Sequence, residues 1–275
     1  MWVIVRLTAR EVQRRKLLWM ALALGFVFVA LFAVGFHFIY QEITGQVAVG
    51  RSELNIFVNF FLTAGLYVIN FLSVMMAVLT SVGTVSGEIA SHTIQSLATK
   101  PVHRWEILLG KWTAYAGMLA VYMACLSGGL LLVVYLIADY TPQNWLGTIG
   151  FLALEGWVIL AVSFLGGTFL STVANGVLAF MLYGIAFVGG WVEQIGSLMQ
   201  NEAAVNIGIV TSLLLPSEAI WRRAASLMQP ALIRSLPSNP FGTASVPSPA
   251  MVVYAGLYIV VLLTVALWVF GRRDL

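Results

Sequence analysis

The sequence predicts an all-helical integral membrane protein, and its composition and long apolar runs carry that prediction. Of its 275 residues, 60% are hydrophobic and 9% are charged, and the mean hydropathy is +0.95. Soluble globular domains carry roughly 25% charged residues, so the composition excludes that class. Several apolar runs also reach the roughly 20 residues that a helix needs to cross the hydrocarbon core.

Six such runs predict six membrane-spanning helices within a single membrane domain over residues 17–275. The expected spans are Leu17–Tyr40, Phe57–Val82, Ile107–Ala138, Leu146–Thr172, Gly176–Val192 and Met251–Phe270. The fourth and fifth spans are separated by only a few residues, among which Asn175-Gly176 is a turn signal. We therefore expect these two spans to form a tight antiparallel pair.

The basic residues predict the orientation, because Lys and Arg in short loops are retained on the cytoplasmic side. Ten of the fourteen Lys and Arg residues fall in segments that six spans place on one side. They are Arg6, Arg10, Arg14, Arg15, Lys16, Lys100, Arg104, Lys111, Arg272 and Arg273. Both termini are therefore expected in the cytoplasm, and the net charge of +3 reflects this bias rather than affinity for nucleic acid.

Residues 1–16 are expected to form an amphipathic helix on the inner membrane surface. Trp2, Val5, Ala9 and Val12 share one face at helical spacing. The opposite face carries Arg6, Arg10, Gln13 and Arg14. The alternative is a basic flank that only fixes the orientation of the first span.

A polar stripe follows the second span over roughly 100° of the helix surface. It consists of Asn55, Asn59, Thr63, Asn70, Ser73, Ser81 and Thr84. Polar groups are costly against lipid, so the stripe should face other helices or a water-accessible path. Helix–helix hydrogen bonding is one interpretation, and a path lined by Asn55, Asn59, Thr63, Asn70 and Ser73 is the other.

The charged segment Ser86–Lys111 lies between the second and third spans. A helix is expected over Glu88–Thr99, and Pro101 ends it because proline lacks an amide donor and clashes with the preceding turn. Val102–Lys111 then begins a second helix that continues into the third span. The pattern predicts a compact knob on the cytoplasmic side.

The residues of this segment resemble the first cytoplasmic loop of type-two ATP-binding-cassette (ABC) transporter permeases. The matching positions are Gly87-Glu88, Thr93, Leu97, Pro101-Val102, Arg104 and Gly110-Lys111. The resemblance extends to the N-terminal amphipathic helix, the six spans and the closing segment Phe270–Leu275. His92 and His103 depart from it, since the family usually has glycine and serine at these positions.

The resemblance implies that loop 86–106 docks on a separate ATPase subunit and transmits its nucleotide-driven movement to the spans. The residues that would couple the two proteins are Glu88, His92, Thr93, Leu97, Pro101 and Arg104. No G-x-x-x-x-G-K-[ST] phosphate loop occurs in the sequence, so ATP and Mg²⁺ would be bound by the partner and no cofactor by this chain.

The same resemblance implies a prokaryotic plasma-membrane transporter of twelve spans, built from a homodimer or a similar pair, with two ATPase copies. Export by alternating access is the expected function. The alternative is a membrane scaffold that passes mechanical signals or assists cofactor or protein assembly outside the cell. A stand-alone secondary transporter is disfavoured, because few ionisable residues fall within the spans.

The longest external region is 193–250. Ala203–Leu215 is apolar but too short to cross, which predicts a re-entrant or interfacial helix, and an amphipathic helix should begin at Pro216. In that second helix Ile220 and Trp221 should oppose Arg222 and Arg223. A gate over the exit and a passive anchor are both consistent with these helices.

Two further features bear on chemistry. Glu155 is expected near the outer end of the fourth span, where it reaches the interface or couples transport to a proton or cation. His37, His92 and His103 are scattered, and no H-E-x-x-H motif or paired carboxylates occur in the sequence. We therefore expect no enzymatic activity in this chain.

Overall fold

The computed structural model describes residues 1–14, 16–46, 50–90, 103–230 and 245–272, and these are almost entirely helical, with no strand among them. The helices are α1 (Trp2–Arg14), α2 (Lys16–Gln46), α3 (Arg51–Ala90), α5 (Arg104–Ala138), α6 (Trp145–Phe169), α7 (Thr172–Leu198), α8 (Glu202–Leu214), α9 (Ser217–Met228) and α11 (Pro249–Arg272).

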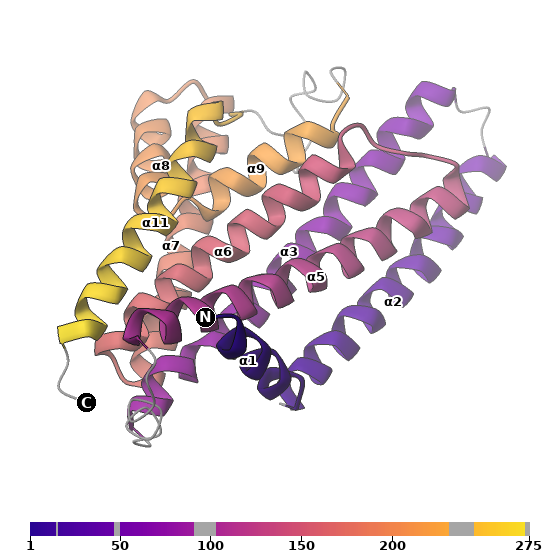
Figure 1. Ribbon diagram of the computed structural model, residues 1–275. Helices are drawn as coiled ribbons and strands as arrows, with labels where there is room; N and C mark the ends of the chain where they lie inside the picture. The colour runs from indigo at the N-terminus through magenta and orange to yellow at the C-terminus, as the bar shows by residue number, and fades with distance from the viewer. Residues whose placement is uncertain (15, 47–49, 91–102, 231–244, 273–275) are drawn as a thin grey trace.

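Six of these helices are long and apolar enough to cross a membrane, which confirms the predicted spans. They are α2, α3, α5, α6, α7 and α11. Figure 1 shows α1 and the C-terminal end of α11 at one end of the bundle, with α8 and α9 at the other. We call these the inner and the outer end. The assignment of the inner end to the cytoplasm stays a prediction.

The core lies along α3 and α6. In the most apolar 18-residue stretch of each helix, 61% of the residues of α3 and 67% of those of α6 are buried, whereas only 11% are buried in α2. α3 packs on α5, α6 and α7, and α6 also contacts α9 and α11. α2 runs along one edge of the bundle (Figure 1), where Gly25 lets it approach Leu126 of α5 closely. Its outward face is therefore available to lipid or to a partner.

The α6–α7 junction differs from the predicted turn. α6 ends at Phe169, and Ser171 caps α7 by accepting a hydrogen bond from the backbone N–H of Ala174 at 3.4 Å. The predicted Asn175-Gly176 turn is wrong, because both residues lie inside α7. The side-chain amide of Asn175 donates to the backbone oxygens of Ser163 at 2.9 Å and Val82 at 3.3 Å. This asparagine joins three helices instead of turning the chain.

The outer helices α8 and α9 meet at an angle of 105°, with Leu215 and Pro216 at the bend. Their positions confirm the two helices predicted from the sequence. The helix is amphipathic as expected, but the expected exposure of its polar face is wrong, because α9 packs against α6, α7 and α11 and is buried on nearly every side. Arg222, expected on a polar outer face, is only 1% exposed. Tertiary contacts around the whole circumference override the sequence periodicity here.

Candidate functional site

The predicted coupling segment joins two helices at the inner end. α3 ends at Ala90 and α5 begins at Arg104, so Glu88 lies in the last turn of one and Arg104 opens the other. The coupling candidates His92, Thr93, Leu97 and Pro101 lie outside the described residues. The structure therefore describes only the two helices that flank the segment. The C-terminal end of α3 and the N-terminal end of α5 lie on the side of the bundle where α1 lies (Figure 1).

The first turns of α5 carry α1. The N-terminal amine of Met1 lies 3.4 Å from Oε1 of Glu106. Gly110 permits close contact, since a Cβ there would lie 2.9 Å from Cγ2 of Ile4. α1 thus packs directly on the helix that follows the coupling segment, and a displacement of that helix would move α1 as well.

The polar stripe of α3 lies within the protomer, with one exception. Asn55 is exposed, whereas Asn59, Thr63, Asn70, Ser73, Ser81 and Thr84 are buried. Thr63 and Ser73 donate to backbone oxygens one turn back in α3, to Asn59 and Ile69 respectively, both at 2.8 Å.

Four stripe residues bond across to other segments. The amide of Asn59 donates to the hydroxyl of Tyr140 and to the backbone oxygen of Met228, both at 3.1 Å. The amide of Asn70 donates a hydrogen bond to Glu155 at 3.0 Å. The hydroxyls of Ser81 and Thr84 donate to the hydroxyls of Ser163 and Tyr115, both at 2.8 Å. In the protomer the stripe therefore joins α3 to α5, α6 and α9, and its lining of a path stays a prediction.

Glu155 lies deeper than the sequence suggested. It is 0% exposed in the middle of α6, and its Oε1 accepts a hydrogen bond from the amide of Asn70 at 3.0 Å. The expectation that it reaches the interface is wrong, because α3 covers this face of α6. A carboxyl group buried here depends on Asn70 for the hydrogen bond that offsets its loss of water.

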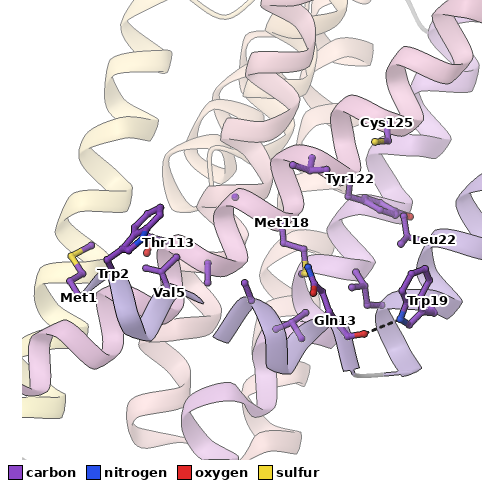
Figure 2. A pocket seen from close by; sticks show the side chains of 16 residues that line it. Met1, Trp2, Val5, Gln13, Trp19, Leu22, Thr113, Met118, Tyr122 and Cys125 are labelled. Atoms are coloured by element: carbon purple, nitrogen blue, oxygen red, sulfur yellow. Dashed lines mark hydrogen bonds between the residues drawn. The ribbon is translucent and has the colours of Figure 1, made fainter. Parts of the chain in front are cut away.

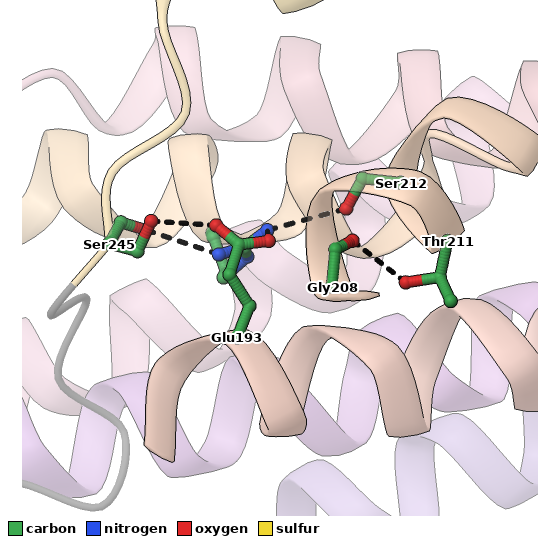
Figure 3. Close-up of polar contacts among 6 residues, drawn as sticks. Glu193, Gly208, Thr211, Ser212 and Ser245 are labelled. Carbon is green, nitrogen blue, oxygen red and sulfur yellow. Dashed lines mark hydrogen bonds and ion pairs between the residues drawn. The ribbon is translucent and has the colours of Figure 1, made fainter. Parts of the chain in front are cut away.

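The outer end holds a charged cluster that the sequence did not reveal (Figure 3). Nη2 of Arg222 lies 2.7 Å from Oε2 of Glu193, and both side chains are almost fully buried. The hydroxyl of Ser245 donates to Oε1 of Glu193 at 2.6 Å, and Nη1 of Arg222 donates to the backbone oxygen of Ser245 at 3.3 Å. Nη2 also reaches the hydroxyl of Ser212 at 3.5 Å. The cluster thus ties α7, α8, α9 and the segment before α11 together.

Glycines bring α7 and α8 close enough to form this cluster. A Cβ at Gly189 would collide with Thr211, and one at Gly208 would collide with Glu193. A third contact, between Gly196 and Ala204, is nearly as tight. Figure 3 shows Gly208 and Thr211 of α8 facing the helix that carries Glu193. A sequence signal existed in the spacing of these small residues, but small residues pack many helix pairs and do not name a partner.

Among the residues that the structure describes, no group of three or more His, Cys, Asp and Glu side chains could hold a metal ion. The polar groups gather instead along α3 and at the outer cluster. Both arrangements include hydrogen bonds that join different helices.

A comparison with protein families decides the class of protein. A family model described as ABC-2 family transporter protein matches residues 2–275. The chain belongs to the ABC-2 transporter family. It is therefore a membrane permease subunit of an ABC transporter, and membership implies an ABC ATPase subunit as partner. No curated protein matches the chain.

The family match confirms the resemblance drawn from the coupling segment and from the closing residues. In this ABC-2 permease the six spans, α1 and the pair α8–α9 all fall inside the matched range. The whole described bundle is thus one permease of this family.

Proposed function

We propose that this permease subunit couples ATP hydrolysis by a separate ATPase to export of a substrate by alternating access. Two permease copies and two ATPase copies form the transporter, with both termini and the coupling loop in the cytoplasm of a prokaryotic cell. The ATPase binds ATP and Mg²⁺, and this chain holds neither and performs no catalysis. The family match carries the proposal, and the geometry of α3 supports it.

α3 provides a direct connection from the coupling segment to the outer end. It contains 40 residues, so at 1.5 Å per residue it is about 60 Å long and exceeds the roughly 30 Å hydrocarbon core. Its inner end carries Glu88, and near its outer end Asn59 bonds the backbone of Met228 at the end of α9. A tilt of α3 driven by the ATPase would therefore displace α9.

The bent helix pair α8–α9 acts as the outer gate in this proposal. The Glu193–Arg222 pair holds α9 on α7 in the conformation described. Opening would require these buried charges to separate or to move together. This cost would keep the outer end closed until the ATPase supplies the energy.

Charge reversal in the coupling segment tests the proposal. Glu88→Lys or Arg104→Glu should abolish stimulation of the ATPase and transport in proteoliposomes, while the protein still folds. Glu53→Lys and Arg51→Glu are matched controls, because both residues are exposed at the other end of α3. The controls should keep coupled activity. Coupled activity that survives both inner reversals would contradict the proposal.

A second function is favoured by one observation. Six of the seven stripe residues are buried inside the protomer, so their polar groups serve helix contacts. This suits a membrane scaffold that passes ATPase movement to an assembly outside the cell without solute flux. Both functions require the coupled ATPase, and a flux assay on the reconstituted complex distinguishes them.

A further inference from the structure

A cavity of about 1050 Å³ lies between α1, the start of α2 and the inner half of α5. Figure 2 shows Trp2 and Val5 of α1, Trp19 and Leu22 of α2, and Met118 of α5 around it. None of these elements belongs to the outer cluster or to the stripe of α3. The cavity lies at the inner end, at the level where an interfacial helix meets the first span.

The walls of this cavity are mostly hydrocarbon. Three of the polar groups on its lining already hydrogen-bond to the protein backbone: Nε1 of Trp19 to Gln13 at 2.9 Å, the hydroxyl of Tyr122 to Ala21 at 3.1 Å and the hydroxyl of Thr113 to Leu109 at 2.9 Å. Water needs two or more polar partners in a cavity, and such walls offer it few. The shape and chemistry suit an apolar chain.

The cavity exists because α1 diverges from α5. At Gly110 a Cβ would touch Ile4 of α1, but seven residues later, at Gly117, a Cβ would meet nothing within 4 Å. Gly117 lines the cavity. The two helices therefore form a wedge that is closed at Ile4 and Gly110 and open further along α5.

Cations lie on α1 next to the residues that line this wedge. At about 100° per residue, Gln13, Arg6 and Arg10 lie about 20°, 40° and 80° from Trp2 around α1. The expectation that Gln13 lies on the face opposite Trp2 is wrong, because both residues line the cavity. Both arginines are exposed, and so are Arg14 at the end of α1 and Lys16 at the start of α2. Trp2 is 80% exposed and Trp19 is 63% exposed, and tryptophan is enriched at the level of lipid headgroups.

We propose that this cavity binds the acyl chain of a phospholipid with a negatively charged headgroup, which rests on Arg6 and Arg10. With the inner end in the cytoplasm, such lipids are supplied by the cytoplasmic leaflet. The occupant is a resident lipid, which stays bound whether or not ATP is hydrolysed. Its retention is measured without ATPase or transport, so failure here leaves the proposed permease function intact.

A second copy of the chain fits this opening less well. A symmetric contact places the same surface of both copies together, so the arginines of both α1 helices would lie in one interface. Like charges brought together disfavour such an interface. A headgroup phosphate neutralises them instead.

Native mass spectrometry of the purified protein tests the lipid site. We expect one phospholipid per protomer, enriched in phosphatidylglycerol or another anionic lipid. Gly117→Trp should lower its occupancy about tenfold by filling the cavity. Gly256→Trp on α11 is the matched control, since a Cβ there also meets nothing within 4 Å, and it should change nothing.

The double change Arg6→Glu with Arg10→Glu tests the headgroup. It should retain an apolar occupant and reduce the preference for phosphatidylglycerol over phosphatidylcholine about tenfold or more. Equal lipid occupancy in wild type and Gly117→Trp would overturn the site. An unchanged headgroup preference in the arginine variant would overturn the role of the cations.

The wild-type protein offers an independent measurement that needs no variant to fold. Cys125, the sole cysteine, is exposed and lines the cavity. After delipidation, its modification by a maleimide should accelerate about tenfold, and added dioleoylphosphatidylglycerol should slow it again more than dioleoylphosphatidylcholine does. Equal rates in all three conditions, or a Cys125–Cys125 crosslink between two copies, would exclude the lipid.

Discussion

The α7–α9 contact at the outer end of this permease and α1 with the start of α2 at the inner end place their charges in opposite ways. At the outer end Glu193 and Arg222 are buried and paired within one chain. At the inner end Arg6, Arg10 and Lys16 are exposed to whatever surrounds the protein. The charges of Glu193 and Arg222 are thus neutralised within the protomer, whereas these cations remain accessible.

The difference has an energetic consequence. Breaking a buried ion pair leaves an uncompensated charge and costs about 3–5 kcal/mol, whereas partly exposed pairs contribute about 0–1 kcal/mol. The Met1–Glu106 pair at the inner end is partly exposed. The outer end should therefore resist separation, while the inner end can adjust with little loss of stability. Four substitutions test this contrast, from the largest expected effect to the smallest.

Arg222→Met should destabilise the protein by about 3–5 kcal/mol, because Glu193 would lose its buried partner. Denaturant unfolding in mixed micelles measures the free energy of unfolding. Arg223→Met is the matched control on the same helix, and it removes only a contact to the backbone of Pro247. Adding Glu193→Gln to Arg222→Met should recover part of the loss. Equal losses for Arg222→Met and Arg223→Met would contradict a buried outer pair.

Gly189→Val should destabilise the α7–α8 pair by about 1–3 kcal/mol, because its side chain would collide with Thr211. Gly184→Val on the same helix is the control, since a Cβ there meets nothing within 4 Å. Both changes place a β-branched residue in α7, so the difference between their thermal unfolding midpoints isolates the helix contact. Similar midpoints would show that α7 and α8 are not tightly packed.

Glu155→Leu should cost about 1–3 kcal/mol, because the amide of Asn70 would lose its buried acceptor. Glu155→Gln keeps an acceptor oxygen in the same place and should cost less. Comparing the unfolding free energies of both variants separates the hydrogen bond from the charge. A Gln variant less stable than the Leu variant would show that the hydrogen bond to Asn70 is not what stabilises this position.

Glu106→Gln should have the smallest effect, about 0–1 kcal/mol, and high salt should reduce it further. The measurement is the unfolding free energy at low and at high ionic strength. A loss as large as that of Arg222→Met would remove the contrast between the two ends. The inner pair would then have to be desolvated by something beyond this chain.

Local patterns were sufficient to predict α1 and its apolar face. The face of Trp2, Val5, Ala9 and Val12 was read from helical periodicity, and these four residues line the inner cavity. Likewise, Pro216 marked the start of α9 and long apolar runs marked the spans. Each of these features depends on residues a few positions apart, for which sequence order and spatial order agree.

Distant contacts account for the predictions that were wrong. Asn175-Gly176 resembles a turn, but Ser163 and Val82 offer backbone acceptors that hold Asn175 inside α7. The burial of Glu155 depends on α3, whose Asn70 is 85 residues away from Glu155 along the chain. The hydrophobic periodicity of one helix does not show which other helix will pack against it.

The sequence by itself determined that this is a helical permease with six spans and an amphipathic N-terminal helix, and it predicts a coupling segment between spans two and three. Hydropathy, periodicity and motif spacing encode these properties locally. Only the tertiary structure decided that the stripe of α3 faces its own protomer, that Arg222 meets Glu193, and that α1 diverges from α5 to leave a cavity. The physical reason is that burial and pairing are properties of helices packed together, not of any one helix.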